Sequence, residues 1–414
     1  MAIYRSGIPR DIVKRKGFEM RCEKNLSVAI IQPYIPHYRE PIFNLLSKQR
    51  HPAPEYMLYA STKAGINIKT SETAKATIPP ESGGLTWHFT KTVWFGKIYF
   101  WQSFNISVAL LRKYNAIIYP GYMYDISTWI SIVIAKLSGK RTIMWTHGFV
   151  KRETGIKGWL RKTFYRLSDG FLLYGNHARK IMLEYGFQPE DLYVVYNSLD
   201  YERQCLVRDK ITDEVIACKK KKLFTLPDLP VLIYIGRLTH QKKLDMLIDA
   251  VNKLAVNGMC MNLLLIGSGP EQENLEAKAK QLDIAKYVVF YGPSYCEEDL
   301  GPLISLADIC VAPGEIGLTC MHSLAYGTPV ITHDNPDSQM PEWEAIQPGK
   351  TGALFRQNDV EDLTSVIESW LKQKRCRKTI RKDCQDIIDI FYNPKYQLQI
   401  INGAVSGIPA TQFP

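Results

Sequence analysis

Two loops in the second half of the chain place glycine and cationic residues directly after apolar runs. Gly236-Arg237 follows the run at 231–235, and Lys242 stands five positions after Arg237. Gly267-Ser268-Gly269-Pro270 follows the next run. Glycines permit close backbone approach, helix starts offer free N–H groups, and Arg and Lys neutralise phosphate charge. The pattern therefore predicts a diphosphate site, although each piece alone also fits a solvated loop.

The order of these pieces is more specific than any one of them. Four segments succeed one another: YIGRLTHQKKLDMLIDAV, LLLIGSGPEQENL, VVFYGPSYCEEDL and LADICVAPGEIGLTCMHSLAYGTPVITHD. Together they resemble the donor domain of the family 4 retaining glycosyltransferases, over most of residues 193–355. The first half is similar only in outline, through strand order, TIMWTHG and VVYNSLD. The resemblance implies an α/β chain of GT-B fold, with two doubly wound Rossmann-like domains facing each other across a cleft.

The resemblance also implies roles for individual residues. Arg237 and Lys242 match the cations that hold the donor diphosphate, where charge accumulates as the glycosidic bond breaks. His147 matches a histidine that the first domain presents towards the donor sugar, although a histidine at a strand end is often structural. The remaining donor-binding positions in these loops are Gly236, Gly267, Gly269, Pro293, Gly314 and His322.

The sequence departs from the family at its pair of glutamates. Aligned on Gly327-Thr328-Pro329, the first glutamate position holds Gly314, with Glu315 one place later, and the second holds His322. Glu315 can still contact the donor sugar, and His322 can bind ribose or phosphate or simply pack. Glu342 and Glu344 can contact hydroxyls in place of the missing glutamate, or one of them can be a solvated acid near a helix start.

The loop after the first strand departs as well. It reads QPYIPHYR and lacks the glycine pair that family members commonly have there. Without glycine the backbone cannot approach a phosphate in the same way. We therefore expect Tyr38 and Arg39 to contact the acceptor, or else to be ordinary residues at a helix start.

Charge is distributed unevenly along the chain. Residues 1–200 contain 28 Lys and Arg residues against 14 Asp and Glu residues, whereas residues 201–414 contain 24 against 27. A basic first half favours an anionic lipid surface or an anionic substrate, and no nucleic-acid-binding module accompanies it. The segment KGWLRKTFYRLS predicts a helix that docks on an anionic membrane or merely packs on its own domain; its cations are Lys157, Arg161, Lys162 and Arg166.

Strand-like apolar runs alternate with helical patterns throughout the 414 residues, which predicts parallel sheets. We expect an acceptor-binding domain at 25–200, a polar linker at 201–226 and a donor-binding domain at 227–385. Residues 386–414 are expected to return to the first domain. The nine dispersed cysteines, the basic N-terminus without an apolar run and the lack of a spanning segment predict a cytoplasmic protein, peripherally associated with the inner face of the membrane.

These inferences predict a retaining glycosyltransferase that moves a sugar from a nucleotide diphosphate donor to a hydroxyl acceptor. The resemblance suggests a surface polysaccharide or lipid-linked glycan as the product. No D-x-D motif occurs, so we expect neither metal nor cofactor. Two alternatives remain open, a nucleotide-sugar 2-epimerase of the same fold and a non-catalytic partner that lost the glutamate pair.

Overall fold

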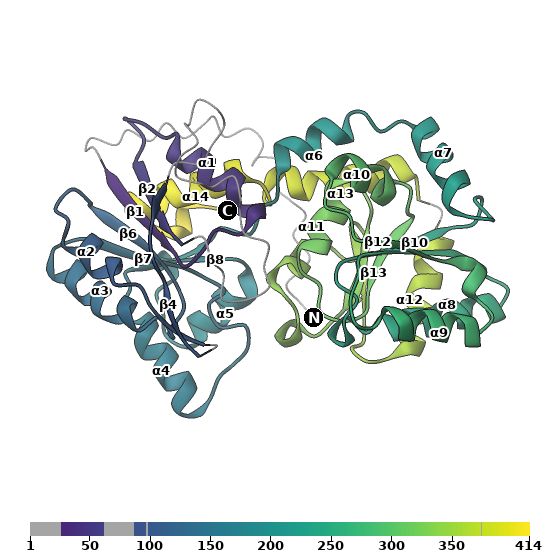
Figure 1. The fold of residues 1–414 in the computed structure, drawn as a ribbon, viewed down its shortest axis with the longest axis horizontal. Helices are drawn as coiled ribbons and strands as arrows, with labels where there is room; N and C mark the ends of the chain where they lie inside the picture. The colour runs from purple at the N-terminus through teal and green to yellow at the C-terminus, as the bar shows by residue number, and fades with distance from the viewer. Residues whose placement is uncertain (1–25, 62–86, 97, 374) are drawn as a thin grey trace.

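Figure 1 shows two α/β domains side by side in the computed structural model. The structure describes residues 26–61, 87–96, 98–373 and 375–414. The basic N-terminal residues, from which we expect no signal peptide, lie outside these ranges. Each domain has a parallel sheet with helices on both faces, as the alternating patterns predict.

The first domain contains a seven-stranded sheet in the order β3-β2-β1-β6-β7-β8-β9. The neighbouring strands run parallel, and the apolar runs at 28–31 and 116–120 are buried along their whole length. A two-stranded antiparallel hairpin, β4-β5, lies outside this sheet. The strands are β1 (Ser27–Gln32), β2 (Glu55–Ala60), β3 (Trp87–Phe89), β4 (Val93–Phe95), β5 (Tyr99–Trp101), β6 (Ala116–Pro120), β7 (Arg141–Thr146), β8 (Gly170–Leu173) and β9 (Leu192–Val194).

Among the described residues, helices α1 to α5 flank this first sheet, and α1 follows the loop with Tyr38 and Arg39. Their bounds are α1 (Glu40–Ser47), α2 (Phe104–Leu110), α3 (Ile126–Leu137), α4 (Gly155–Tyr165) and α5 (Asn176–Glu184).

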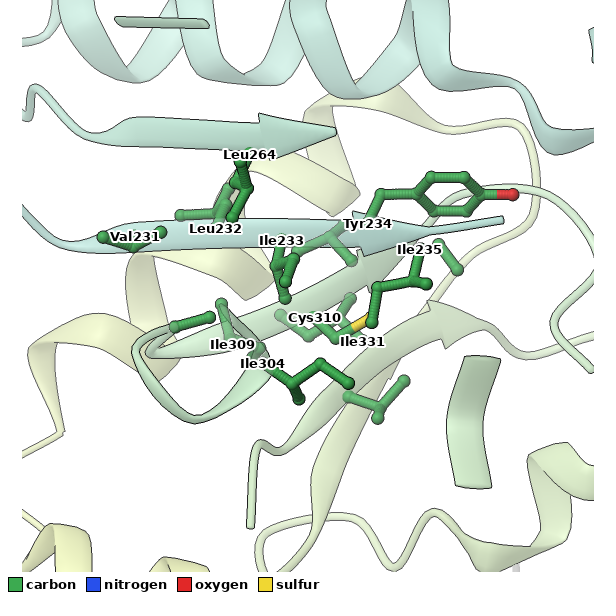
Figure 2. Close-up of a cluster of buried hydrophobic side chains, with 14 of the residues drawn as sticks. Val231, Leu232, Ile233, Tyr234, Ile235, Leu264, Ile304, Ile309, Cys310 and Ile331 are labelled. Carbon is green, nitrogen blue, oxygen red and sulfur yellow. The ribbon is translucent and has the colours of Figure 1, made fainter. Parts of the chain in front are cut away.

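The second domain contains a six-stranded parallel sheet in the order β12-β11-β10-β13-β14-β15. Its central strand β10 is buried at every residue, and Figure 2 shows its side chains packed against Leu264, Ile309, Cys310 and Ile331 of neighbouring strands. The strands are β10 (Val231–Ile235), β11 (Asn262–Ile266), β12 (Val288–Gly292), β13 (Ile309–Ala312), β14 (Val330–His333) and β15 (Gly352–Phe355). The helices are α8 (Leu244–Val256), α9 (Gln272–Gln281), α10 (Glu297–Ser305), α11 (Leu318–Ala325), α12 (Val360–Lys372) and α13 (Arg377–Ile390).

The residues between the sheets are helical rather than extended. Helices α6 (Tyr201–Arg208) and α7 (Asp213–Leu223) occupy the segment expected to be a linker, and Val207, Ile216 and Phe224 join the core of the second domain. Only one side of each helix is buried, so most of their residues are polar. This polar composition suggested a linker. The segment is thus part of the second domain's packing.

The C-terminal helix packs on the opposite domain. Helix α14 (Pro394–Val405), yellow in Figure 1, lies among the elements of the first domain. Ile400, Ile401 and Ala404 belong to the same buried cluster as Val28 and Ile118. The chain therefore crosses between the domains twice.

Candidate active site

The main cleft has a volume of about 660 Å³ and lies between the two domains. One wall contains the carboxyl ends of β10 and β11 and the start of α11; the other contains the loop before α1 and α1 itself. In the second sheet the strand order reverses between β10 and β13. Ligands of doubly wound sheets bind at such reversals. Residues of the cleft include His37, Tyr38, Lys48, Asp200, Gly236, Arg237, Gly267, Pro293, Glu297, Thr319 and His322.

Arg237 and Lys242 differ in how they are engaged. The side chain of Arg237 is exposed at the cleft and makes no ion pair with any residue that the structure describes. Lys242 donates to the backbone oxygen of Glu315 at 2.9 Å, and its Nζ lies 3.3 Å from Glu315 Oε1. Among the described residues, Arg237 is thus an unpaired cation at the cleft and Lys242 a paired one close by, while Lys48 and Lys395 also line the cleft.

Three of the predicted donor-site glycines are required by packing between loops. Gly236 and Gly267 have φ angles of +147° and +141°. A Cβ on Gly267 would stand 1.9 Å from the oxygen of Gly236, and one on Gly269 would stand 2.2 Å from the oxygen of Leu238. The loops after β10 and β11 therefore touch backbone to backbone, which fixes the shape of the cleft floor.

The same kind of contact explains the glycine at the first glutamate position. A Cβ on Gly314 would stand 2.1 Å from the oxygen of Gln241 and 2.7 Å from Cα of Lys242. The N–H of Gly314 donates to the oxygen of Lys242 at 3.0 Å. No glutamate fits there without backbone movement, and the carboxylate of Glu315 instead reaches Lys242.

His322 lines the cleft from α11, at the second glutamate position. Its Nδ1 lies 3.3 Å from Gln204 Nε2 and 3.7 Å from Glu297 Oε1. Burial lowers the pKa of His322, Glu297 opposes that shift, and His37 adds to it. The ring is therefore neutral near pH 7. Because the amide of Gln204 donates to Nδ1, the ring proton lies on Nε2, which can donate one hydrogen bond.

The residues predicted in the first domain occupy three different positions. Tyr38 lines the main cleft. Arg39 is 7% exposed and stacks on the ring of Trp145 at 4.0 Å. His147 lies in a separate small pocket with His177 and Glu344. Burial, and then the Arg39 guanidinium, lower the pKa of His147 to about 4.

Arg39 is a buried cation without a carboxylate partner among the described residues. Its Nη1 lies 3.5 Å from Gln32 Oε1, a marginal distance, and its Nη2 has no hydrogen-bond partner. Gln32 Nε2 also has none. Both residues lie where β1 ends, beside the reversal of the first sheet. The aromatic ring of Trp145 offsets part of the cost of this buried charge.

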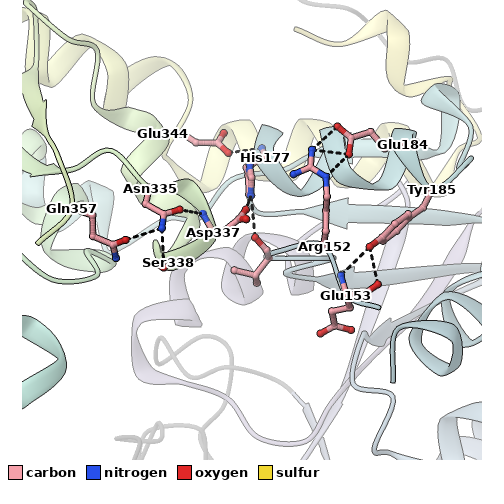
Figure 3. A network of polar contacts seen from close by, with 11 residues as sticks. Arg152, Glu153, His177, Glu184, Tyr185, Asn335, Asp337, Ser338, Glu344 and Gln357 are labelled. Atoms are coloured by element: carbon pink, nitrogen blue, oxygen red, sulfur yellow. Dashed lines mark hydrogen bonds and ion pairs between the residues drawn. The ribbon is translucent and has the colours of Figure 1, made fainter. Parts of the chain in front are cut away.

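A polar latch joins the domains beside the cleft, and Figure 3 shows it. Both oxygens of Glu344 accept backbone N–H groups, from Asn176 and His177, at 2.6 Å each. His177 Nε2 lies 3.0 Å from Asp337 Oδ1. A carboxylate of the second domain thus caps the N-terminus of α5 in the first. A Cβ on Gly175 would stand 2.6 Å from Glu344 Oε1, so a larger residue there would have to displace this carboxylate.

Glu342 forms a second contact between the domains. It is 3% exposed, and its Oε1 accepts from Asn197 Nδ2 at 2.9 Å. Its Oε2 has no partner, and burial raises the pKa of its carboxyl group. Neither Glu342 nor Glu344 is therefore a solvated acid, which corrects one of the two interpretations of this segment.

Several residues of the cleft were missed in the sequence. Gln204 and Glu297 position His322 but come from α6 and α10, far apart in the chain. Asn197 meets Glu342 across the domain boundary. Only Asn197 carried a signal, since it follows an apolar run as a polar residue.

The cations of α4 are only partly free. Arg161 Nε donates to Glu153 Oε2 at 2.8 Å, and Lys162 Nζ lies 5.3 Å from the ring centre of Tyr185. Lys157 and Arg166 are exposed, and Lys157 lies 3.7 Å from Glu153. The helix is basic, yet half of its expected docking charge is held against its own domain.

The described ranges contain neither a metal-ligand cluster nor a membrane-spanning helix. Nowhere in those ranges do three or more His, Cys, Asp or Glu side chains gather as they would around a metal ion. Within the same residues, every helix is too short or too polar to cross a bilayer.

Residues 217–386 match the family model described as Glycosyl transferases group 1. The chain is 31% identical over 169 residues to the lipopolysaccharide core biosynthesis glycosyltransferase LpsE of Rhizobium meliloti, covering 40% of this chain and 46% of that protein. It is 28% identical over 167 residues to a GDP-mannose-dependent phosphatidylinositol monomannoside mannosyltransferase of Mycolicibacterium smegmatis, covering 38% and 42%. The chain thus spans less than half of these relatives.

Solved structures match over nearly the whole chain. Anabaena Alr3699/HepE in complex with UDP superimposes with a TM-score of 0.67 at 15% identity, covering 91% of this chain and 98% of that one. The apo form of the lipopolysaccharide outer core galactosyltransferase WaaB gives 0.66 at 17%, covering 92% and 99%. At such identities the likeness concerns the fold. The resemblance found in the sequence is thus confirmed at this level: residues 217–386 carry a glycosyl transferases group 1 domain, and the chain has a GT-B fold.

Proposed function

We propose that this protein is a retaining glycosyltransferase that uses a nucleoside diphosphate sugar. The observation that carries the proposal is the unpaired guanidinium of Arg237 at the strand-order reversal, in the domain that matches the glycosyltransferase model. An exposed cation beside glycine loops and a helix start suits a diphosphate. HepE binds UDP within the same fold, which supports a nucleotide in this cleft.

The proposed reaction breaks the bond between C1 of the donor sugar and the diphosphate oxygen. The acceptor oxygen forms a new bond to C1 on the same face, and the acceptor proton leaves with the diphosphate. Arg237 neutralises the charge that develops on the departing diphosphate. Lys242 joins it after exchanging the carboxylate of Glu315 for phosphate, which leaves Glu315 Oε1, now 3.3 Å from Lys242, for a sugar hydroxyl.

The first domain supplies the acceptor side of this proposal. Tyr38 faces the cleft, and Arg39 lies behind it with an unpartnered nitrogen. A buried cation is costly unless it is paired. We therefore propose an acceptor with an anionic group, such as a phosphate of a lipid-linked glycan, that Arg39 meets when the acceptor binds. LpsE and the phosphatidylinositol mannosyltransferase, both named for surface glycan or glycolipid synthesis, support this class of acceptor.

The proposal includes peripheral attachment to the cytoplasmic face of a membrane and catalysis without metal. The basic first half supports the attachment. Arg237, Lys242 and the start of α11 supply positive charge around the diphosphate. Activity is accordingly expected to survive excess EDTA, and loss restored only by Mg²⁺ or Mn²⁺ would refute metal independence.

A thermal-shift screen of nucleoside diphosphate sugars tests the proposal. A true donor at 100 times its dissociation constant adds about 2.7 kcal/mol to the free energy of unfolding. The shift should disappear in Arg237→Ala. Product analysis of the hit then separates the alternatives: epimerised sugar without acceptor would indicate a 2-epimerase, and binding without any conversion would indicate a non-catalytic partner.

A further inference from the structure

Helix α3 buries several polar side chains and exposes several apolar ones. Its buried face carries Ser127, Thr128 and Ser131 together with Ile132 and Ala135. Its exposed face carries Ile126, Ile130, Val133 and Leu137, with 46%, 44%, 45% and 84% of their surfaces exposed. The spacing of these four residues places them on one stripe of the helix. A helix on the surface of a soluble protein normally shows the opposite arrangement.

The buried polar face is fully explained by a hydrogen-bond network. Asp125 caps α3 and accepts from Thr128 Oγ1 at 2.6 Å and from Asn105 Nδ2 of α2 at 3.1 Å. Ser131 Oγ donates to the backbone oxygen of Asn105 at 2.7 Å. These bonds fix α3 against α2 with its serines inward. Because these bonds hold the serines inward, the opposite stripe of Ile126, Ile130, Val133 and Leu137 faces solvent.

The hairpin β4-β5 extends this apolar surface. Phe95, Ile98 and Tyr99 at its tip are 55%, 55% and 50% exposed. The hairpin lies against the start of α3, because Phe100 pairs with Asp125 and the rings of Tyr99 and Tyr124 meet edge to face at 5.4 Å. We call the exposed residues of both elements the apolar face: Phe95, Ile98, Tyr99, Ile126, Ile130, Val133 and Leu137.

Helix α4 adds further apolar exposure at the same end of the domain. It packs on α3 through the rings of Trp129 and Phe164, 4.8 Å apart, and Figure 1 shows α2, α3 and α4 at the outer side of the first domain. Ile156 and Trp159 of α4 are 84% and 66% exposed. Exposed isoleucine with tryptophan and tyrosine is typical of surfaces that meet the interfacial layer of a bilayer.

The charge around the apolar face complements an anionic surface. Residues 87–168 contain 13 Lys and Arg residues and only two acids, Asp125 and Glu153. Asp125 is buried in the network just described, and Glu153 bonds Arg161. Lys91, beside β4, and Arg112 and Lys113, after α2, are exposed. Lys136 pairs with Asp169 and Arg152 pairs with Glu184, whereas the three exposed cations just named form no ion pair among the described residues. The surroundings of the apolar face therefore carry a net positive charge.

We propose that the apolar face inserts into the headgroup region of an anionic lipid bilayer, with the surrounding cations contacting lipid headgroups. The inference does not depend on the donor assignment, since no residue of the cleft takes part in it. It also differs from docking by the basic α4 alone, because the apolar side chains supply binding that salt cannot screen.

Co-flotation with vesicles tests the proposal on the full chain. The vesicles are phosphatidylcholine with and without phosphatidylglycerol. Wild type should float with the anionic vesicles, less at high salt but not to zero. The variant Ile126→Ser/Ile130→Ser/Val133→Ser should bind at least about tenfold more weakly. The matched control Leu226→Ser/Val256→Ser, which changes exposed apolar residues of the second domain, should bind like wild type.

Three outcomes would overturn the proposal: binding by the triple variant equal to wild type, equal loss in the control, or no flotation of wild type. Circular dichroism and thermal unfolding of each variant establish that it is folded. Sedimentation in the absence of lipid tests whether a second copy of the chain binds the apolar face instead. A wild-type dimer that the triple variant dissociates, without flotation, would assign the face to a second copy of the chain instead.

Discussion

An arginine and a histidine of each domain can be compared near the domain boundary, and the two pairs are built differently. In the second domain Arg237 is exposed and unpaired among described residues, and His322 lines the cleft beside Gln204 and Glu297. In the first domain Arg39 is buried against Trp145, and the ring of His147 lies 4.6 Å from that of Tyr174, tilted by 43°, outside the main cleft.

Arg237 is therefore accessible to a ligand, whereas Arg39 is buried. A solvated guanidinium such as that of Arg237 can exchange water for a diphosphate with little rearrangement. The guanidinium of Arg39 must first lose part of its aromatic contact, or a neighbour must move, before an anion can reach it. The two arginines therefore differ in access: a ligand can reach Arg237 in this arrangement, whereas it could reach Arg39 only after a local rearrangement.

The largest expected effect is at Arg237. Arg237→Ala should lower turnover on the native donor by roughly a hundredfold or more, because the cation acts on charge that develops in the transition state. Lys242→Ala should act in the same direction. Steady-state kinetics measure both, with Arg356→Ala as control, since that cation of the same domain is 71% exposed. Wild-type turnover in both variants would contradict the placement of the donor site at the second-domain wall of the cleft.

Arg39 tests the other half of the comparison. Arg39→Met keeps an unbranched side chain against Trp145 but removes the charge. The KM for the acceptor should rise about tenfold, while the affinity for the donor stays unchanged. Thermal unfolding should show equal or greater stability, because a buried unpaired charge has been removed. A loss of stability with unchanged acceptor KM would make Arg39 a packing residue.

The two walls were also predictable to different degrees. Arg237, Lys242 and the glycine loops follow one another in one short stretch, so their order in the sequence already described the site. The reason for a glycine at position 314 could be found only in the folded structure, because the backbone that excludes a glutamate belongs to Gln241 and Lys242. The parallel strands were predicted from apolar runs, but α6 and α7 were interpreted as a linker because each buries only a narrow stripe.

The first domain was harder because its contacts are distant in sequence. Arg39 meets Trp145, and Asn197 meets Glu342, across separations that no local pattern records. The direction in which the apolar stripe of α3 faces could not be predicted from the sequence, since periodicity gives a face but not its direction. The buried serines around Asp125 decide that direction, and they become visible only in the folded chain.

A smaller effect is expected from the acid and the histidine of α11 and its loop. His322→Ala should weaken a free nucleoside diphosphate by about tenfold, the size of one lost hydrogen bond. Glu315→Gln should lower the rate with the sugar donor. It should not weaken binding of the free nucleotide, because it releases Lys242 from its carboxylate partner. Calorimetric titration measures both affinities. If Glu315→Gln weakens the nucleotide and His322→Ala does not, the two roles are exchanged.

The smallest effect concerns pH and the histidine of the first domain. The folded-state pKa of His147 is about 4, below the ordinary value of about 6.5, because burial and Arg39 disfavour the charged ring. Between these two values the unfolded chain binds more protons at this residue than the folded chain does. Stability from His147 is therefore complete above pH 6.5 and is lost as the pH falls towards 4. His147→Gln should show a shallower decrease of melting temperature between pH 7 and 5 than wild type, whereas His51→Gln, at an exposed position, should follow wild type. Equal slopes of melting temperature against pH for wild type and His147→Gln would mean that the ring is solvated and free to protonate. The contrast between the two domains would then hold for Arg39 and Arg237 but not for His147.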